Sequence, residues 1–241
     1  MTRFCLAAVW VLPGWAAAGG ETLAQASQAG NPLTMMAVLA VLSLLPFAVV
    51  MLTSFSKIAV VLSLARSAMG TQQAPPTVVL TGLAAVLSAH IMSPVMARMY
   101  EVGREAARDA ESGAQILAAV ERTAEPLRAF LVKHGSAEER SRFVELAREL
   151  RPPEEATQVQ EGDLFVVVPA FVITELKEAF QMGFLLFLPF LVLDMVIANI
   201  LLALGMQSLS PSQVSLPFKI LLFVTVDGWP LLAQGLIQGY R

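Results

Sequence analysis

Residues 165–241 read FVVVPAFVITELKEAFQMGFLLFLPFLVLDMVIANILLALGMQSLSPSQVSLPFKILLFVTVDGWPLLAQGLIQGYR, and this stretch decides the fold. Between Glu178 and Lys219, its only charged side chain is Asp194. An apolar run of this length can form one membrane-spanning helix of about 20 residues and most of a second. A charge at the centre of a bilayer costs roughly 2.5–3.5 kcal/mol on insertion scales, so it is seldom kept without a partner. The few charged residues here are therefore the informative ones.

Composition places the whole chain in the same class. Of its 241 residues, 56% are hydrophobic and 15% are charged, whereas soluble domains carry about 25% charged residues. The net charge of −3 gives no nucleic-acid footprint. A single cysteine, Cys5, excludes a disulfide framework and a cysteine-based metal site. Charge is concentrated, since 24 of the 35 Asp, Glu, Lys and Arg residues fall between Arg98 and Asp163.

We therefore expect an all-α membrane protein with about four mature apolar segments and a helical extracytoplasmic insert. Residues 1–18 have the features of a signal peptide: Arg3, a short apolar core and an Ala16-Ala17-Ala18 cleavage site. The alternative is an uncleaved N-terminus at the membrane interface. A hydrophobic helical block at 19–98, a polar helical insert at 99–162 and a second hydrophobic block at 163–241 follow.

Periodicity predicts where individual helices lie. Apolar residues at 58, 61, 62 and 65 recur at helical spacing, and Gly70 with Pro75-Pro76 ends that helix. In the insert, Ser136 and Glu139 have the spacing of a capping box, and the apolar stripe Phe143, Leu146 and Leu150 follows. Five prolines interrupt the apolar segments, which predicts kinked helices covered by protein or water: Pro46, Pro94, Pro189, Pro217 and Pro230.

The predicted spans also give an orientation. If the leader targets the mature N-terminus outward, the first span places Lys57 and Arg66 on the cytoplasmic side. The insert, with 10 basic and 14 acidic residues, is then extracytoplasmic, in agreement with the positive-inside rule.

Six charged residues of the second block are candidates for buried charges or subunit contacts: Glu175, Lys177, Glu178, Asp194, Lys219 and Asp227. Charges inside membrane segments usually pair with one another or with backbone, so we interpret these as interhelical or intersubunit contacts. Glu175 and Glu178 share a helical face, whereas Lys177 points elsewhere. The alternative is a proton-linked relay, which needs carboxylates facing water.

Enzyme chemistry finds no support in the sequence. It contains no P-loop, no GxSxG, no HExxH and no dyad of an intramembrane protease. We expect no catalytic, cofactor-binding or metal-binding residues and no cofactor.

Three stretches together resemble the FliP/SctR family of type III secretion and flagellar export. They are MLTSFSKIAVVLSLAR at 51–66 with GTQQAPP at 70–76, PAFVITELKEAF at 169–180 running into FLPF at 187–190 and Asp194, and LSP at 209–211 through LPFKILLFVTVDGW at 216–229. The resemblance covers nearly all of residues 33–100 and 163–241.

This resemblance implies a bacterial inner-membrane protein and a role as the pore-forming core subunit of a protein export gate. It implies a pentamer, partners of the FliQ/SctS and FliR/SctT kinds, unfolded protein substrates and no nucleic acid. A methionine-rich gasket in the family corresponds here to Met206, Gln207, Ser208 and Leu209. Only one of these is methionine, the side chain whose flexibility suits an adaptable seal.

Two choices stay open from the sequence. The residues around Thr53 to Lys57 and the ending 235–241 look slightly more like the injectisome branch, and the leader favours the flagellar one. A small ion- or solute-conducting secondary transporter, with the buried charges as its binding site, is the alternative from another functional class. An inverted internal repeat would support a transporter, and the two apolar blocks do not mirror each other.

Overall fold

The computed structural model describes residues 32–71, 74–108, 113–206 and 208–241. In these ranges the regular structure is entirely α-helical, which confirms the all-α prediction. The predicted signal peptide, its cleavage site and Cys5 lie outside the described residues. The helices are α2 (Pro32–Leu52), α3 (Phe55–Ala68), α4 (Thr77–Arg108), α5 (Gly113–His134), α6 (Ala137–Glu149), α7 (Pro153–Ala156), α8 (Leu164–Ala203), α9 (Pro211–Thr225) and α10 (Gly228–Gln238).

The chain forms two compact units, residues 1–48 and 49–241. The described part of the first unit belongs to α2, whose sequence is apolar throughout. All remaining helices lie in the second unit.

Two helices are long and apolar enough to cross a membrane: α4, over Thr77–Ala106, and α8, over all 40 of its residues. Two bent pairs qualify as broken spans, namely Pro46–Leu52 with α3, and α9 with α10. The described residues thus contain two to four candidate spans, in agreement with the predicted number of apolar segments.

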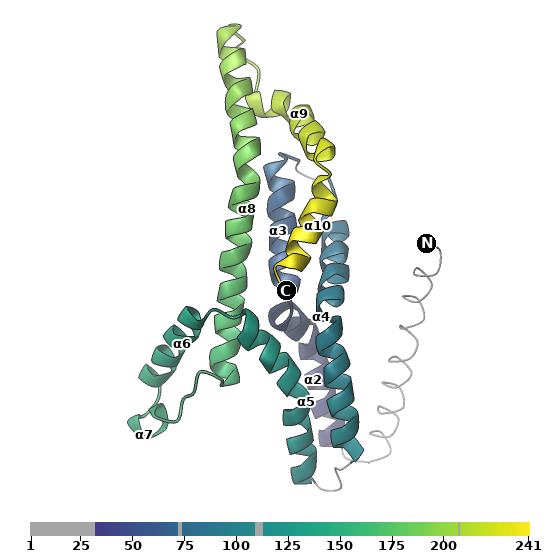
Figure 1. Ribbon diagram of the computed structural model, residues 1–241, viewed down its shortest axis with the longest axis vertical. Coiled ribbons are helices and arrows are strands. Elements are labelled where there is room, and N and C mark those ends of the chain that lie inside the picture. The colour runs from purple at the N-terminus through teal and green to yellow at the C-terminus, as the bar shows by residue number, and fades with distance from the viewer. Residues whose placement is uncertain (1–31, 72–73, 109–112, 207) are drawn as a thin grey trace, which may run out of the picture. The chain divides into compact units, whose positions relative to one another are not determined.

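Helix α3 is the centre of the second unit. Its residues Ile58, Val61, Leu62 and Ala65 are at most 1% exposed, so the predicted buried face is confirmed. This face packs against α8 and α4 (Figure 1). The side chains of the three helices share one apolar cluster. Burial of each large aliphatic side chain stabilises the fold by about 1.5–3 kcal/mol.

The helices continue through their prolines. Helix α8 contains Pro169 and Pro189 and still runs unbroken to Ala203, and α4 continues past Pro94. The bend of 59° that separates α9 from α10 lies instead at Asp227 and Gly228. A proline removes one backbone hydrogen bond, and in these long helices that loss does not end the element.

Local geometry explains the Asp227–Gly228 bend. Asp227 has φ 52°, in the left-handed region that Asp tolerates better than most residues. Gly228 is buried, and a Cβ at this position would overlap the ring of Phe223. That ring in turn meets Trp229 edge-on, with 5.1 Å between centroids. The glycine is therefore needed for close approach.

The polar insert differs from its prediction in two details. Ser136 does precede α6, but its side chain makes no cap hydrogen bond, and its backbone N–H donates to Thr174 Oγ1 at 3.0 Å. Glu139 lies 3.6 Å from Lys177 Nζ, so the predicted capping box is wrong. The predicted stripe is only partly confirmed: Phe143 packs against the cluster of the buried Val144, whereas Leu150 is 86% exposed. Packing of Val144 on Val166 of α8 sets this face, and the apolar spacing within α6 does not.

Two glycines of α10 provide a matched test of the bend. We expect Gly228→Ala to destabilise the protein by about 1–3 kcal/mol, because the added methyl group must displace the Phe223 ring. Gly235→Ala is the control, since nothing lies within 4 Å of a Cβ there. It should be neutral or slightly stabilising, by up to about 1 kcal/mol. Thermal unfolding in detergent measures both variants. Equal losses of stability would contradict the conclusion that Gly228 is needed for the close approach of Phe223.

Candidate functional site: two buried ion clusters and an exposed loop

Helix α3 carries a lysine into the apolar interior. The Lys57 side chain is 1% exposed, and Nζ lies 3.5 Å from Glu175 Oε1. It also forms an ion pair with Glu178, and it sits 4.6 Å from the centre of the Tyr240 ring. We call Lys57, Glu175, Glu178 and Tyr240 the Lys57 cluster. Glu175 and Glu178 lie one helical turn apart on α8, which places both carboxylates toward the same cation.

Tyr240 ties the end of the chain to this cluster. Its hydroxyl donates to Glu175, which is itself 1% exposed. Its ring stacks on Phe130 at 6.0 Å and meets His134 at 5.0 Å, both from α5. The cluster therefore joins α3, α5, α8 and the residues after α10.

His134 is packed beside this cluster, with its ring 5.0 Å from that of Tyr240. Burial, and then the charges of Lys133 and Lys57, lower the pKa of His134. Protonation therefore opposes folding at this position, and the corresponding stability falls as the pH drops through the ordinary histidine range.

A second cluster joins α8 to α9. Lys219 Nζ donates to Asp194 Oδ2 at 2.6 Å, and Ser215 Oγ donates to Oδ1 at 2.5 Å. Both carboxylate oxygens are thus satisfied. Lys219 is 5% exposed and Ser215 is 0% exposed. We call these three residues the Asp194 cluster.

The remaining charged candidates lie elsewhere. Lys177 is half-exposed and faces Glu139 of the insert at 3.6 Å. Asp227 is exposed in the bend between α9 and α10 and belongs to neither cluster. The structure thus brings together Glu175 with Glu178 and Asp194 with Lys219, and it separates Lys177 and Asp227 from both groups.

Sequence reasoning missed Lys57 as the partner of the two glutamates. It treated this residue as a cytoplasmic-side loop cation, and the structure buries it inside the helical unit. A signal was present, since Lys57 directly precedes Ile58 and therefore borders the apolar face of α3. Its partners are 118 and 121 positions away, and local spacing cannot identify them.

The predicted gasket residues occupy the turn between α8 and α9. Met206 is 45% exposed, Leu209 is 44% exposed, and Ser208 is exposed as well. Gln207 lies outside the described residues. Gly205, with φ 71°, starts this turn in a conformation that glycine favours. The Asp194 cluster joins α8 to α9, the two helices that this turn connects.

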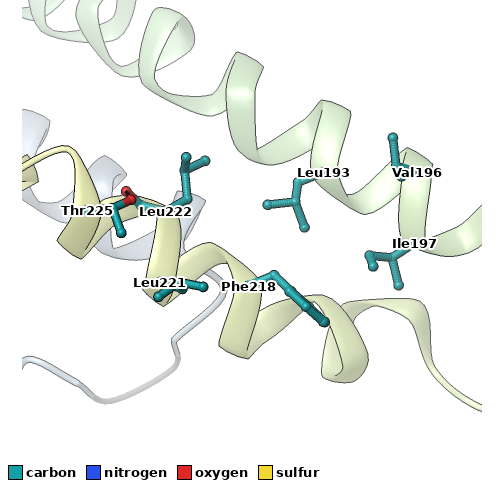
Figure 2. A pocket seen from close by; sticks show the side chains of 7 residues that line it. All are labelled: Leu193, Val196, Ile197, Phe218, Leu221, Leu222 and Thr225. Carbon is teal, nitrogen blue, oxygen red and sulfur yellow. Dashed lines mark hydrogen bonds between the residues drawn. The ribbon is translucent and has the colours of Figure 1, made fainter.

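An apolar groove of about 330 Å³ runs between α8 and α9. Figure 2 shows Leu193, Val196 and Ile197 of α8 and Phe218, Leu221, Leu222 and Thr225 of α9 around it. No charged side chain lines this groove. Helix α8 is exposed on most of its apolar surface, because only 11% of its apolar 18-residue stretch is buried.

Among the described residues, no three His, Cys, Asp or Glu side chains gather closely enough to hold a metal ion. The charged groups that are buried in these ranges instead form ion pairs with residues of other helices: Lys57, Glu139, Glu175 and Lys219.

The Lys57 cluster generates a stability prediction. Lys57→Met leaves Glu175 buried without its cation, and loss of one partner of a buried pair costs about 3–5 kcal/mol. Lys177→Met is the control, because Lys177 is half-exposed and its partner Glu139 keeps a second cation, Arg142, at 3.5 Å, so the loss should be less than about 1 kcal/mol. Thermal unfolding of the purified proteins in one detergent compares them. Similar losses of stability in both variants would show that the buried Lys57 ion pair stabilises the protein no more than the Lys177 ion pair does.

The chain is similar in sequence to known proteins over most of its length. A model of the FliP family matches residues 38–236. The hypersensitivity response secretion protein HrcR of Ralstonia nicotianae is 46% identical over 87% of this chain and 96% of its own length. The Yop proteins translocation protein R of Yersinia pestis is 44% identical over 88% and 98%. The flagellar biosynthetic protein FliP of Caulobacter vibrioides is 42% identical over 86% and 76%. With the match running through α3, α4, α8 and α9, the chain belongs to the FliP family.

Proposed function

We propose that this protein is a pore-forming core subunit of a type III protein export gate. The family match carries the proposal, because it spans both apolar blocks and relatives bear the names of secretion, translocation and flagellar biosynthetic proteins. The FliP family consists of structural components of an export apparatus and not of enzymes.

The surface of the second unit supports an oligomer. Helix α8 exposes large apolar side chains along much of its length, including Phe180, Phe184 and Leu191, each at least 53% exposed. Its carboxylates Glu175, Glu178 and Asp194 are meanwhile paired inside the chain. A helix of this kind needs lipid or another subunit on its outer face. We infer that copies of this chain, together with FliQ/SctS-type and FliR/SctT-type proteins, cover part of it in a closed cyclic ring.

The turn between α8 and α9 is the proposed constriction. Met206 and Leu209 are exposed in the single chain, and a ring would bring equivalent turns together around one axis. A flexible thioether can close around a pore and still adapt to different unfolded segments. The mechanism is passive: the apolar ring excludes water and ions until a substrate arrives.

An injectisome role is favoured over a flagellar one. The alignment spans 96–98% of HrcR and the Yop translocation protein R, but 76% of Caulobacter FliP. We further propose inner-membrane localisation with residues 99–162 on the extracytoplasmic side.

A secondary transporter remains the alternative class of function. Its binding site would need charged groups open to solute. The buried Glu175 and Lys57, and the half-buried Asp194, are instead engaged with partners in the same chain.

Native mass measurement tests the proposal directly. The full chain is purified in detergent, alone and after co-expression with the FliQ/SctS-type and FliR/SctT-type proteins. A discrete pentamer that grows on co-expression is expected. A monomer or dimer whose mass ignores those proteins would refute the export-gate assignment and favour the transporter.

Asp194 provides a test of assembly. In Asp194→Asn the ion pair with Lys219 is lost, so α9 and the turn that follows α8 lose their alignment. We expect fewer rings per purified chain. Asp227→Asn removes an equal charge from an exposed bend and keeps a residue that tolerates the left-handed conformation. It should assemble as the wild type does. Equal ring yields in both variants would contradict a role for the Asp194 cluster in assembly.

The proposed constriction predicts a leak. Met206→Ser combined with Leu209→Ser should let small ions pass through the reconstituted complex in the absence of substrate, because polar side chains favour a hydrated pore. Met96→Ser, at an exposed methionine of α4, is the control. Ion flux from proteoliposomes measures both. A tight double variant would place the seal outside this turn.

A further inference from the structure

A groove between α4 and α5 combines an apolar floor with cationic edges. Its floor is formed by Ile91, Pro94, Val95, Pro126, Ala129 and Phe130. These residues follow helical spacing on both helices, so the groove runs along the line where α4 and α5 meet. The hollow near its centre has a volume of about 260 Å³, and two neighbouring hollows share Pro94 at one end and Pro126 at the other.

Positive charge gathers at this groove. Arg98 of α4 and Lys133 of α5 line the central hollow, together with His134 and Tyr240, and no Asp or Glu side chain does so. His90 and Arg241 line the neighbouring hollow, again without an Asp or Glu side chain. Glu121 and Glu125 line only the hollow on the other side of Arg98. Arg122 lines that hollow as well, and Arg128 lies 3.5 Å from Glu125.

Arg98 is the free cation of this group. It is exposed, and it makes no hydrogen bond or ion pair with any residue in the described ranges. Lys133 donates to the backbone oxygen of Arg241 at 3.1 Å, and an ammonium group has two further protons to donate.

The position of Arg98 along α4 matches the edge of a membrane. Residues 67–97 contain no Asp, Glu, Lys or Arg, so Arg98 is the first charged side chain after the apolar part of the helix. It lies 21 residues after Thr77, where α4 begins. At about 1.5 Å per residue this is roughly 31 Å, close to the thickness of the hydrocarbon core. If Thr77 lies at one surface of the bilayer, Arg98 stands at the depth of lipid phosphates on the other, with the apolar floor of the groove beginning below it.

We propose that the α4–α5 groove binds one anionic phospholipid, with its phosphate between Arg98 and Lys133 and an acyl chain along the apolar floor. An arginine guanidinium can hold a phosphate through two parallel hydrogen bonds, and the lysine adds a point charge. Basic pockets between helices at a membrane surface are typical sites for anionic headgroups. A neutral phospholipid can place an acyl chain on the apolar floor but brings no net negative charge to the cations. Free phosphate can pair with the cations but leaves the apolar floor uncovered.

Three probes distinguish these cases on the full-length protein in neutral detergent: dimyristoyl phosphatidylglycerol, dimyristoyl phosphatidylcholine and inorganic phosphate. Native mass spectrometry counts retained lipid, and thermal unfolding reports its effect. We expect phosphatidylglycerol to remain bound and to raise Tm by a few degrees. We expect phosphatidylcholine and phosphate to do neither. Equal retention or stabilisation by phosphatidylcholine, or an equal Tm rise with phosphate alone, would overturn the proposal.

Variants then locate the site. Arg98→Gln with Lys133→Gln should weaken phosphatidylglycerol binding by about tenfold or more, since each good charged contact is worth about a factor of ten or above. The matched control is Arg104→Gln with Arg142→Gln, which removes the same charge from exposed positions outside the groove. Its binding should equal that of the wild type. Equal binding in both double variants would overturn the assignment. The same spectra report the oligomeric state, so loss of lipid and loss of the ring are read separately.

Discussion

Lys57 brings a positive charge into the centre of the helical unit, and the arrangement of the second unit depends on how that charge is satisfied. Removing an ammonium group from water is costly unless opposite charge and hydrogen bonds replace the solvent. Glu175 and Glu178 supply the charge from α8, and the Tyr240 ring covers the cation from another side. Because Tyr240 also contacts α5, this one group relates α3, α8, the insert and the last residues of the chain. The apolar face of α3 provides most of the burial energy, and the ion pair fixes the register in which that face is used.

The pairing of polar groups inside the chain also explains the character of the outer surface. Both carboxylate oxygens of Asp194 accept hydrogen bonds within the α8–α9 pair, so the polar atoms of this cluster have partners inside the chain. What remains unsatisfied is apolar: the outer face of α8 and the groove against α9. A chain whose buried charges are paired internally and whose apolar surface is open is suited to be a subunit of a membrane assembly. It is poorly suited to bind a charged solute at those groups.

The insert is joined to this framework more closely than a separate soluble pair of helices would be. Helix α4 continues from the apolar segment to Arg108, past the boundary at residue 98 that charge density suggests. Helices α5 and α6 both pack on α8, and Thr174 of α8 accepts the backbone hydrogen bond at the start of α6. Apolar and polar parts therefore meet along continuous helices. The α4–α5 groove, with cations at its edge and carbon at its floor, lies at that meeting point.

The sequence by itself determined the helical class, the apolar segments, the buried face of α3 and the family, because these follow from hydropathy, local periodicity and long motifs. It also identified most members of the two ion clusters, since charges are conspicuous in an apolar run. Tertiary structure alone decided the pairings. Lys57 meets Glu175 across 118 positions, and Asp227, equally conspicuous in the sequence, remains in an exposed bend. It also decided which face of α6 is buried, because Val144 packs on α8 while the regular Leu146 and Leu150 stripe faces outward. The reason is physical: spacing along a helix fixes which residues share a face, but only packing against another helix fixes which face is used.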